Sequence, residues 1–299
     1  MSVTSKSPKD VLRMAFEVAK NALAPYSHRC SPKKFTQYQL FAVLVLKAFL
    51  KTDYRGVCQH LKDCSGLAEA IELSIVPHFT TLQKASRRLL KAAAVKRLLD
   101  ATIERHLGRR STIQIAAVDS TGLECNAASG YFVKRRAKVG GVWKKMAYHR
   151  YPKLAVVCDV RDHFIFAYHA KRGPKPDVGE FETLIKQAAT TVKIVRVVAD
   201  AGYDSEGNHT YARETLGARS TIPPKHGRPT KKPASGKYRR LMQTHFNKKT
   251  YRQRAQVETV MSMLKRRQGN HVRGRSYHSQ CRDLRLMVLT HNVMILYFG

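Results

Sequence analysis

Three acidic residues, Asp119, Asp200 and Glu258, have the surroundings that metal-dependent carboxylate chemistry requires. Asp119 and Asp200 end two apolar runs, IQIAAVD and VRVVAD, which we predict to be neighbouring strands. Small residues follow both acids, so the backbone can turn away and leave each carboxylate at the sheet edge. Glu258 lies on a predicted helix that can pack over these strand ends. Three converging carboxylates repel one another unless a cation holds them, and Mg²⁺ binds through carboxylates and substrate phosphates.

Carboxylates that hold metal ions in this way are typical of phosphodiester displacement. Two ions about 3.5–4 Å apart activate the attacking oxygen and stabilise the leaving oxygen. We therefore predict that Asp119, Asp200 and Glu258 are the metal ligands and the catalytic residues. Singly, each acid also has a simpler interpretation. Asp119 or Asp200 could be a turn-forming residue at a strand end, and Glu258 could pair with Arg254 on an amphipathic surface helix.

The segment that carries Glu258 is TYRQRAQVETVMSMLKRR, residues 250–267. It contains no Gly or Pro and is rich in helix formers, so we predict one continuous helix. One arc of this helix has apolar residues at the i, i+3, i+4, i+7 spacing of a buried stripe. The polar arc, about 60° wide, carries a phenol, two cations and the acid: Tyr251, Arg254, Lys265 and Glu258.

The elements that must position the acids lie in the second part of the chain. We expect strands at residues 111–121, 150–160, 163–173, 192–204 and 218–224, and helices at residues 181–191 and 207–217. This order predicts an α/β fold with a mixed sheet and helices on its faces. Two basic segments, residues 134–145 and 225–237, lack an apolar period and are predicted to be mobile loops. The terminal segment 284–298 is predicted to be a core helix in preference to a dimer interface.

Residues 1–110 are predicted to be helical. Residues 35–52 form a strongly apolar helix that Thr36 can cap. Two short helices follow at residues 54–64 and 65–73, and residues 76–107 are expected to form one long basic helix. Short helices before a basic helix resemble a helix-turn-helix module, whose second helix could lie in a DNA groove. The alternative is a plain helical bundle that supports the core.

The charge of the chain indicates its partner. The 299 residues carry 55 Lys and Arg against 21 Asp and Glu, a net charge of +34. Such an excess favours a polyanion, with nucleic acid ahead of an anionic membrane surface. No apolar run approaches the roughly 20 residues of a membrane span, and the N-terminus lacks a signal-peptide core, so we expect a soluble, intracellular protein. The six cysteines form no C-x-x-C pair and are expected to be reduced and structural.

These motifs resemble the DDE transposases of prokaryotic insertion sequences, particularly the group of families four and five. Their third-acid signature, Y-x2-R-x3-E-x6-K, is matched position for position by Tyr251, Arg254, Glu258 and Lys265. The VDST run at Asp119 and the ADAGYD run at Asp200 are similar to the first and second acid motifs of the group. The resemblance covers roughly residues 113–298.

The resemblance implies an RNase H-like catalytic core, residues 111–299, behind a helical domain, residues 1–110, that binds the DNA ends. It implies Mg²⁺ or Mn²⁺, cleavage at element ends and joining of the 3′ ends to target DNA. The expected partners are the terminal inverted repeats and target DNA, bound by a homodimer, with no membrane. The expected DNA contacts are Tyr251, Arg254, Lys265, Trp143 and Arg273. Trp143, the only tryptophan, could stack on an unpaired base or pin its loop to the core.

Two other functions remain open from the sequence. One is a structure-selective nuclease on the same core, which would hydrolyse DNA without joining it. The other is a domesticated DNA-binding protein with an idle site, against which the three intact acids argue. Short inverted repeats on both sides of the gene would favour the transposase over both.

Overall fold

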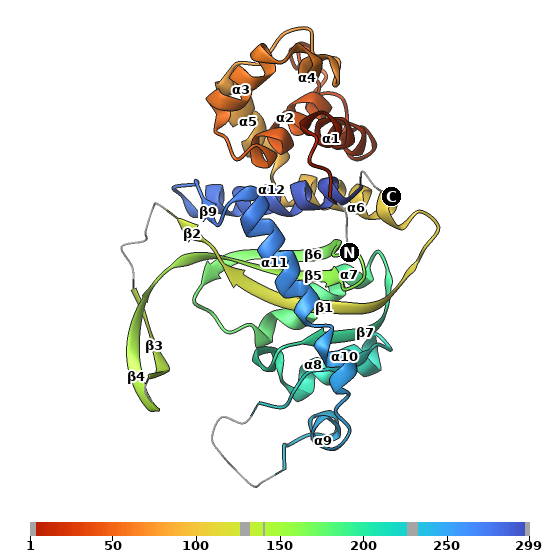
Figure 1. The fold of residues 1–299 in the computed structure, drawn as a ribbon, viewed down its shortest axis with the longest axis vertical. Coiled ribbons are helices and arrows are strands. Elements are labelled where there is room, and N and C mark those ends of the chain that lie inside the picture. Colours follow the sequence, from red (N-terminus) through yellow and green to blue (C-terminus); the bar gives the residue numbers. More distant parts are fainter. Residues whose placement is uncertain (1–3, 126–131, 140, 226–232, 297–299) are drawn as a thin grey trace.

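The structure, a computed structural model, describes residues 4–125, 132–139, 141–225 and 233–296. Its centre is a five-stranded sheet in the order β6-β5-β1-β7-β8 (Figure 1). The strands are β1 (Thr112–Gly122), β5 (Tyr151–Asp159), β6 (Ile165–Gly173), β7 (Lys193–Ala199) and β8 (Arg219–Thr221). β5 is antiparallel to both of its neighbours, whereas β7 is parallel to β1 and to β8. This topology is RNase H-like, so the predicted fold class is confirmed.

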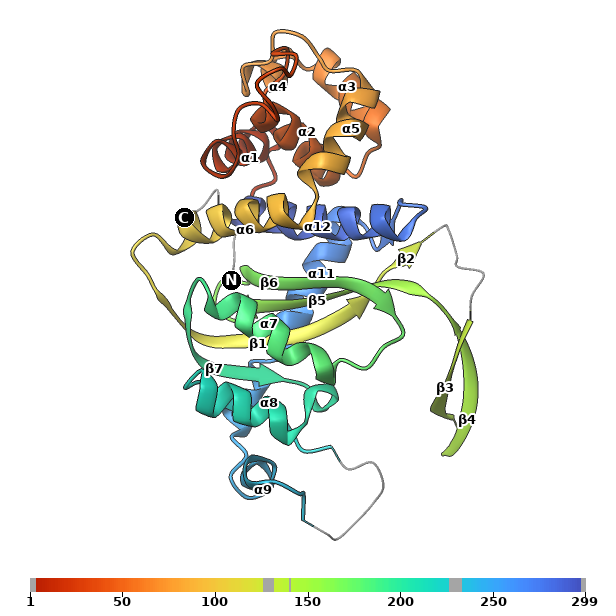
Figure 2. The same ribbon diagram turned by 180° about the vertical axis from the view of Figure 1, so that it is seen from behind.

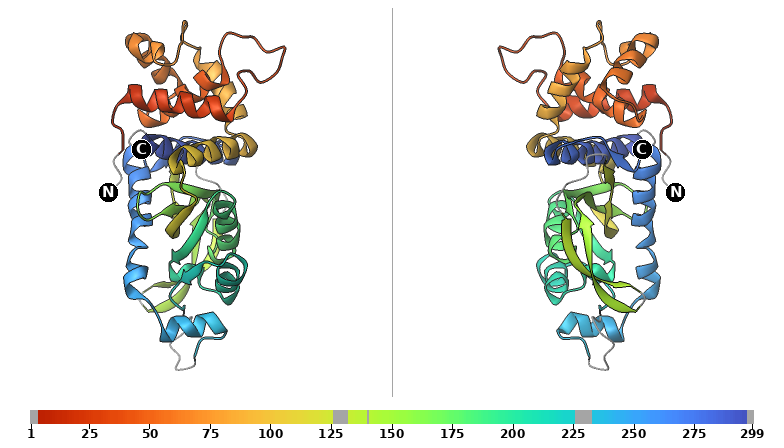
Figure 3. Two further views of the ribbon diagram at one scale, coloured as in Figure 1. Left: turned by 90° about the vertical axis from the view of Figure 1, so that its right-hand side faces the viewer. Right: turned by 90° about the vertical axis from the view of Figure 1, so that its left-hand side faces the viewer.

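Helices cover both faces of the sheet. α11 (Ala255–Gln268) lies over one face, against β1 and β5, and α7 (Phe181–Ala189) covers the other (Figures 1 and 2). The two side views show the sheet between these layers (Figure 3). Because both faces are covered, β5 is buried along nearly its whole length and is apolar from Leu154 to Cys158. The remaining elements of this region are η1 (Val178–Glu180), η2 (Ala201–Tyr203), α8 (Glu206–Thr210), η3 (Tyr211–Thr215), α9 (Lys237–Thr244) and α10 (Lys248–Arg252).

A layer of two helices joins the sheet to the N-terminal helices. α12 (Tyr277–Leu296) and α6 (Ala92–Leu107) lie along the β6 side of the sheet (Figure 1). The Asn292 amide pairs with the backbone of Ile165 in β6, where Oδ1 accepts at 3.1 Å and Nδ2 donates at 2.8 Å. The same Nδ2 donates to Thr102 Oγ1 of α6 at 3.2 Å. Every side chain from Leu286 to Leu296 is buried, which confirms the predicted core helix.

The N-terminal helices are α1 (Pro8–Ala22), α2 (Gln37–Phe49), α3 (Tyr54–Asp63), α4 (Ser65–Glu69) and α5 (Phe79–Leu89). Thr36 caps α2 as predicted, because its Oγ1 accepts the Gln39 N–H while Gln39 Oε1 accepts the Thr36 N–H. The prediction of one long helix over residues 76–107 is wrong. The chain becomes extended at Lys91, so α5 packs on α2 and α3 while α6 packs on α12. Burial on two different surfaces outweighs the continuity of one helix.

A second prediction also fails. Residues 134–145 were expected to be a mobile loop, but they belong to a hairpin of β3 (Phe132–Val139) and β4 (Val142–His149). The dense Lys and Arg residues hid a hairpin signal, namely a Gly-Gly pair between β-forming runs. The side chain of Trp143 lies outside the described part of the structure. Of the predicted loop 225–237, residues 226–232 also lie outside it, and α9 begins at Lys237.

Two short strands, β2 (Glu124–Cys125) and β9 (His271–Val272), pair in parallel and connect the end of β1 to the segment that precedes α12. Among the described helices, none combines the length and the apolar character that crossing a membrane requires.

Candidate active site

The strand register places the first two acids side by side. Val118 of β1 is the parallel partner of Ala199 of β7, and the next residues are Asp119 and Asp200. Neighbouring strands lie about 4.7–4.9 Å apart, so the two carboxylates leave the same region of the sheet. The prediction that this strand ends at Asp119 is wrong. β1 continues to Gly122 because β5 still pairs with it. Asp119 therefore lies inside a strand, beside the point where β7 ends.

Short local hydrogen bonds fix both carboxylates. Asp119 Oδ1 accepts the N–H of Ser120 at 2.7 Å, and Asp200 Oδ1 accepts the N–H of Gly202 at 2.8 Å. Asp200 thereby caps the single turn of η2. A Cβ at position 202 would lie 2.8 Å from Asp200 Oδ1, so a larger residue would displace the Asp200 carboxylate. The small residues after Asp200 thus have the predicted role.

The helix that carries Glu258 is not continuous. α10 ends at Arg252 and α11 begins at Ala255, so the prediction of one helix over residues 250–267 is wrong. Backbone bonds from Arg254 to Tyr251 (2.9 Å) and from Val257 to Arg254 (3.0 Å) span three residues, as in a 3₁₀ helix. The tighter winding carries Arg254 toward the sheet.

Arg254 joins the third acid to the first. One nitrogen of its guanidinium lies 3.4 Å from Asp119 Oδ2, and the other donates to Glu258 Oε1. The simpler interpretation of Glu258, an ion pair with Arg254, is therefore correct. It does not exclude a role in the site, because the same guanidinium also contacts Asp119. The ring of Tyr251 packs on Arg254, with the guanidinium carbon 5.9 Å from the ring centroid.

A cavity of about 390 Å³ opens beside the acids. It is lined by Asp119, Ser120, Thr121, Glu258, Met261, Ser262, Lys265 and Arg266. Lys265 thus lines the same cavity as two of the acids, and its contact with DNA stays a prediction. Ser262 and Arg266 were not predicted, although their spacing of four and eight residues from Glu258 places them on the same helix face. Arg273, predicted to contact DNA, does not line this cavity and lies at the junction with α2.

The electrostatics of Asp119 reflect this crowding. Burial raises the pKa of Asp119 to about 6, and the charges of Asp200 and Glu258 act in the same direction. The Ser120 N–H and the Arg254 guanidinium oppose this rise. Tyr203, 1% exposed behind the acids, has its pKa raised by burial and by the charges of Asp177, Asp119 and Asp200. Its phenol therefore stays neutral.

A divalent ion needs several oxygen ligands that converge on one point. Within the described ranges, no cluster of three or more His, Cys, Asp or Glu side chains is arranged to hold an ion. The guanidinium of Arg254 lies between Asp119 and Glu258 and keeps these two carboxylates from converging on one point. Glu258 is 56% exposed and can change rotamer, whereas Asp119 is only 20% exposed. A donor set of carboxylate oxygens that repel one another fits a hard cation such as Mg²⁺ or Mn²⁺.

We expect the free energy of unfolding of the metal-free protein, kept in a chelator, to depend on pH through Asp119. Its pKa is about 6 in the folded protein against an ordinary 3.8, so the folded state binds this proton more tightly. The stabilisation is fully present below about pH 3.8 and is lost as the pH rises through 6, a change of roughly 3 kcal/mol. Asp119→Asn lacks this dependence. It should therefore unfold at higher denaturant than wild type at pH 7, with the gap closing toward pH 4. If the difference in denaturant midpoint between the two proteins stays constant over this pH range, the pKa of Asp119 is not raised.

Together, the fold and the site define an RNase H-like protein with a carboxylate site on the face covered by α11. Residues 110–293 match the family model described as the transposase DDE domain. The match covers more than half of the chain, and the chain belongs to this family. It carries a transposase DDE domain, and DDE transposases use divalent metal ions.

Solved structures add a more distant likeness. The crystal structure of the Mos1 mariner paired-end complex with Mn matches at 14% identity and a TM-score of 0.24, covering 70% of this chain and 65% of that chain. The Mos1 transposase paired-end complex with the left transposon end matches at 13% identity and a TM-score of 0.22, covering 80% of both chains. At these TM-scores the chains do not superimpose as wholes, and the fold assignment rests on the strand order. The comparison with curated proteins gave no match.

Proposed function

We propose that this protein is the transposase of a prokaryotic insertion sequence of the group of families four and five. It cuts DNA at the ends of the element and joins the 3′ ends to target DNA. The observation that supports this proposal is the adjacent register of Asp119 and Asp200, with Arg254 linking Glu258 to Asp119. A net charge of +34 suits a DNA substrate.

Asp119, Asp200 and Glu258 would hold Mg²⁺ or Mn²⁺, two ions in the proposed mechanism. The bound ions would supply activation of the attacking oxygen and stabilisation of the leaving oxygen. Arg254 neutralises Asp119 and Glu258 in the structure. If Glu258 served as a metal ligand, its ion pair with Arg254 would be lost, and the guanidinium would then be available to a DNA phosphate. Because the pKa of Asp119 is about 6, its carboxylate is available as a ligand at neutral pH.

The remaining residues would bind and position the DNA. Lys265 and Arg266, which line the acid cavity, lie where they can contact the phosphates beside the cut. Tyr251 supports Arg254. Residues 1–110 recognise the terminal inverted repeats, while residues 111–299 carry the chemistry. The protein acts as a homodimer on DNA in the cytoplasm, associated with the nucleoid.

The test is an assay on DNA that carries the inverted repeats flanking the gene, with a supercoiled plasmid as target and Mg²⁺ or Mn²⁺. We expect cleavage at the repeat boundary and a product in which the cut end is covalently joined to the plasmid. Cleavage without joining would support the structure-selective nuclease instead. Binding without cleavage in either metal would support the non-catalytic DNA-binding protein.

Replacing Lys265 by Ala should weaken DNA binding without affecting the fold. No hydrogen bond or ion pair joins the Lys265 ammonium to the described residues, so its charge is free for a phosphate. The slope of log K against log salt should become shallower by about one unit, equally on specific and random duplexes. Fluorescence anisotropy across a salt series measures this slope. A fall in melting temperature with an unchanged slope would make Lys265 a structural residue.

A further inference from the structure

A second group of cations lies away from the acids, where the N-terminal helices meet the segment from β9 to α12. Two cavities there, of about 190 and 440 Å³, share Lys47, Arg273 and Asp283 in their walls, and we call them the junction cleft. The cations that line the junction cleft are Lys47, Lys51, Arg87, Arg273, Arg275 and Arg282. The acids that line it are Asp53 and Asp283. The cleft therefore carries a clear excess of positive charge.

Lys47 is the unusual member of this group. It is the one cation on the apolar helix α2 and is only 9% exposed. Its ammonium lies 4.9 Å from the Tyr54 ring centroid and makes no hydrogen bond or ion pair with the described residues. Burial lowers the pKa of Lys47, Asp283 raises it, and Arg273 lowers it further. A buried ammonium without a bonded anion is costly, so its presence calls for a ligand.

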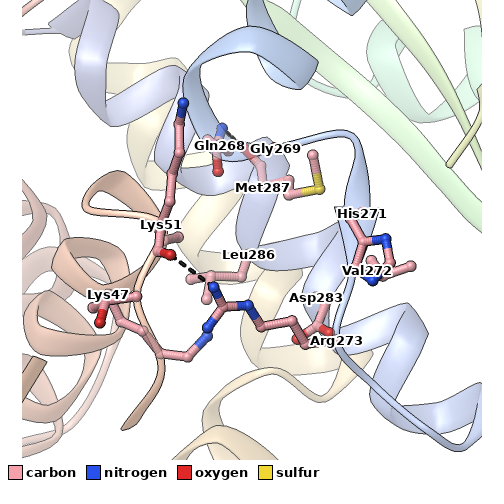
Figure 4. Close-up of a pocket in the computed structure, with 12 residues that line it drawn as sticks. Lys47, Lys51, Gln268, Gly269, His271, Val272, Arg273, Asp283, Leu286 and Met287 are labelled. Atoms are coloured by element: carbon pink, nitrogen blue, oxygen red, sulfur yellow. Dashed lines mark hydrogen bonds between the residues drawn. The ribbon is translucent and has the colours of Figure 1, made fainter. Parts of the chain in front are cut away.

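Arg273 faces Lys47 across the cleft. The two side chains point toward one another (Figure 4), although both are cationic. Arg273 Nη2 donates to the carbonyl of Lys51 at 2.8 Å, which leaves the rest of the guanidinium fork free for another acceptor. Asp283 is engaged by the backbone, because its Oδ2 accepts the Gly274 N–H at 2.8 Å, and burial raises its pKa. Two converging cations with a weakened counter-charge form a pocket suited to an anion.

One hydrogen bond connects a residue of the junction cleft to a residue of the acid cavity. The Lys51 ammonium donates to the carbonyl of Arg266 at 2.7 Å, and the Arg266 side chain lines the acid cavity. From Glu258 to Arg266 the helix rises about 12 Å. Phosphates of one DNA strand are spaced about 3.4 Å along the axis, so a duplex lying along α11 reaches the cleft within on the order of five base pairs.

We propose that the junction cleft binds a backbone phosphate of duplex DNA, with Lys47 and Arg273 as its charged ligands. The proposal rests on the proposed transposase function, which makes duplex DNA the substrate. An ammonium supplies a compact charge, and a guanidinium supplies directed N–H donors to phosphate oxygens. Because Lys47 belongs to α2 and Arg273 to the segment before α12, the bound phosphate ties the N-terminal helices to the catalytic region. DNA would thereby contact both parts at the surface where they already pack against each other.

The test is Lys47→Met, which keeps the length and apolar character of the side chain and removes only its charge. On a random-sequence duplex we expect several-fold weaker binding and a salt slope shallower by about one unit. The melting temperature in chelator should stay the same or rise, because a buried charge without a bonded partner is lost. Arg97→Met is the matched control, since Arg97 is exposed on α6, lines neither cavity and loses the same charge. Its salt slope should not change.

Three outcomes would overturn the proposal. A lower melting temperature for Lys47→Met with an unchanged slope would make Lys47 a structural partner of Asp283. An equal loss of slope in Arg97→Met would show that the slope depends on the net charge of the protein and not on the position of Lys47. If inorganic phosphate at matched ionic strength raises the melting temperature of wild type but not of Lys47→Met, while duplex binding is unchanged, the ligand is a small phosphate compound.

Arg273→Gln provides a second variant if Lys47→Met does not fold. It should show the same loss of slope, and the double variant should lose no more than either single variant, because both residues bind one phosphate. Additive losses would place the two residues on separate contacts. Wild-type binding and strand transfer are measured first. Failure there removes the proposed function, whereas an active wild type with unchanged variants removes only the junction cleft.

Discussion

Replacing Asp119 by Asn, Asp200 by Asn or Glu258 by Gln should abolish cleavage and strand transfer together. Each change keeps the shape of the side chain and removes one of the proposed anionic oxygen ligands. Hard cations need such ligands, and bound metal supplies several kcal/mol of transition-state stabilisation. We expect each rate to fall by roughly 10³-fold or more, since 1.36 kcal/mol corresponds to a factor of ten.

The same variants should remain folded and bind DNA. Asp200→Asn retains a side-chain oxygen that can accept the Gly202 N–H, and Glu258 is largely exposed. Asp119→Asn relieves a buried charge whose pKa is already raised. Each variant adds one positive charge near the DNA, so affinity should be unchanged or higher.

The measurement is the cleavage and joining assay, run beside a gel shift and a thermal melt. Glu104→Gln is the matched control, because it makes the same charge change at an exposed position of α6 and should transfer strands at the wild-type rate. A variant of one of the three acids that cuts and joins normally would remove that residue from the site. If all three variants cut and join normally, the proposed catalytic function is wrong.

Much of the site was predictable because strand ends are strongly marked in the sequence. Apolar runs that end in Asp119 and Asp200 predicted two neighbouring strands, and the parallel register places the two acids next to each other. The i−4 pair of Arg254 with Glu258 was also visible from helical spacing. What the spacing could not show is that Arg254 reaches Asp119, which is 135 residues away along the chain.

Other features could not be predicted because they depend on tertiary packing. No Gly or Pro marks the junction between α10 and α11 or the break between α5 and α6, and each follows from where the flanking helices pack. Lys47 appears in the sequence as a single cation on an apolar helix. Only the fold places it opposite Arg273, at the junction cleft.

Removing residues 1–110 should unfold the rest of the chain, even though these residues are proposed to have a separate function. α12 packs against α1, α2 and α6 as well as against β5 and β6. Ser5 N–H donates to the carbonyl of Met294 at 2.9 Å, and Asn292 bonds both Thr102 and Ile165. The N-terminal helices are therefore part of the environment that buries α12.

The expected loss is large. Exposing a buried Leu, Val or Met side chain costs roughly 1.5–3 kcal/mol, and a domain is stable by only about 5–15 kcal/mol. α12 is buried on all sides from Leu286 to Leu296, so the deletion exposes several such side chains at once. Fragment 111–299 should thus lack a cooperative melt by circular dichroism and should aggregate on size exclusion.

The control separates loss of contacts from loss of chain connection. A protease site placed in the connection between α6 and β1, at Gly108–Arg110, allows the chain to be cut while both parts are present. The nicked protein should stay together and melt cooperatively, because the contacts of α12 with α1, α2 and α6 are kept. If fragment 111–299 instead melts cooperatively near the temperature of the full chain, residue 110 is a true folding boundary. In that case the N-terminal helices can move independently of the catalytic region, and α12 does not depend on them.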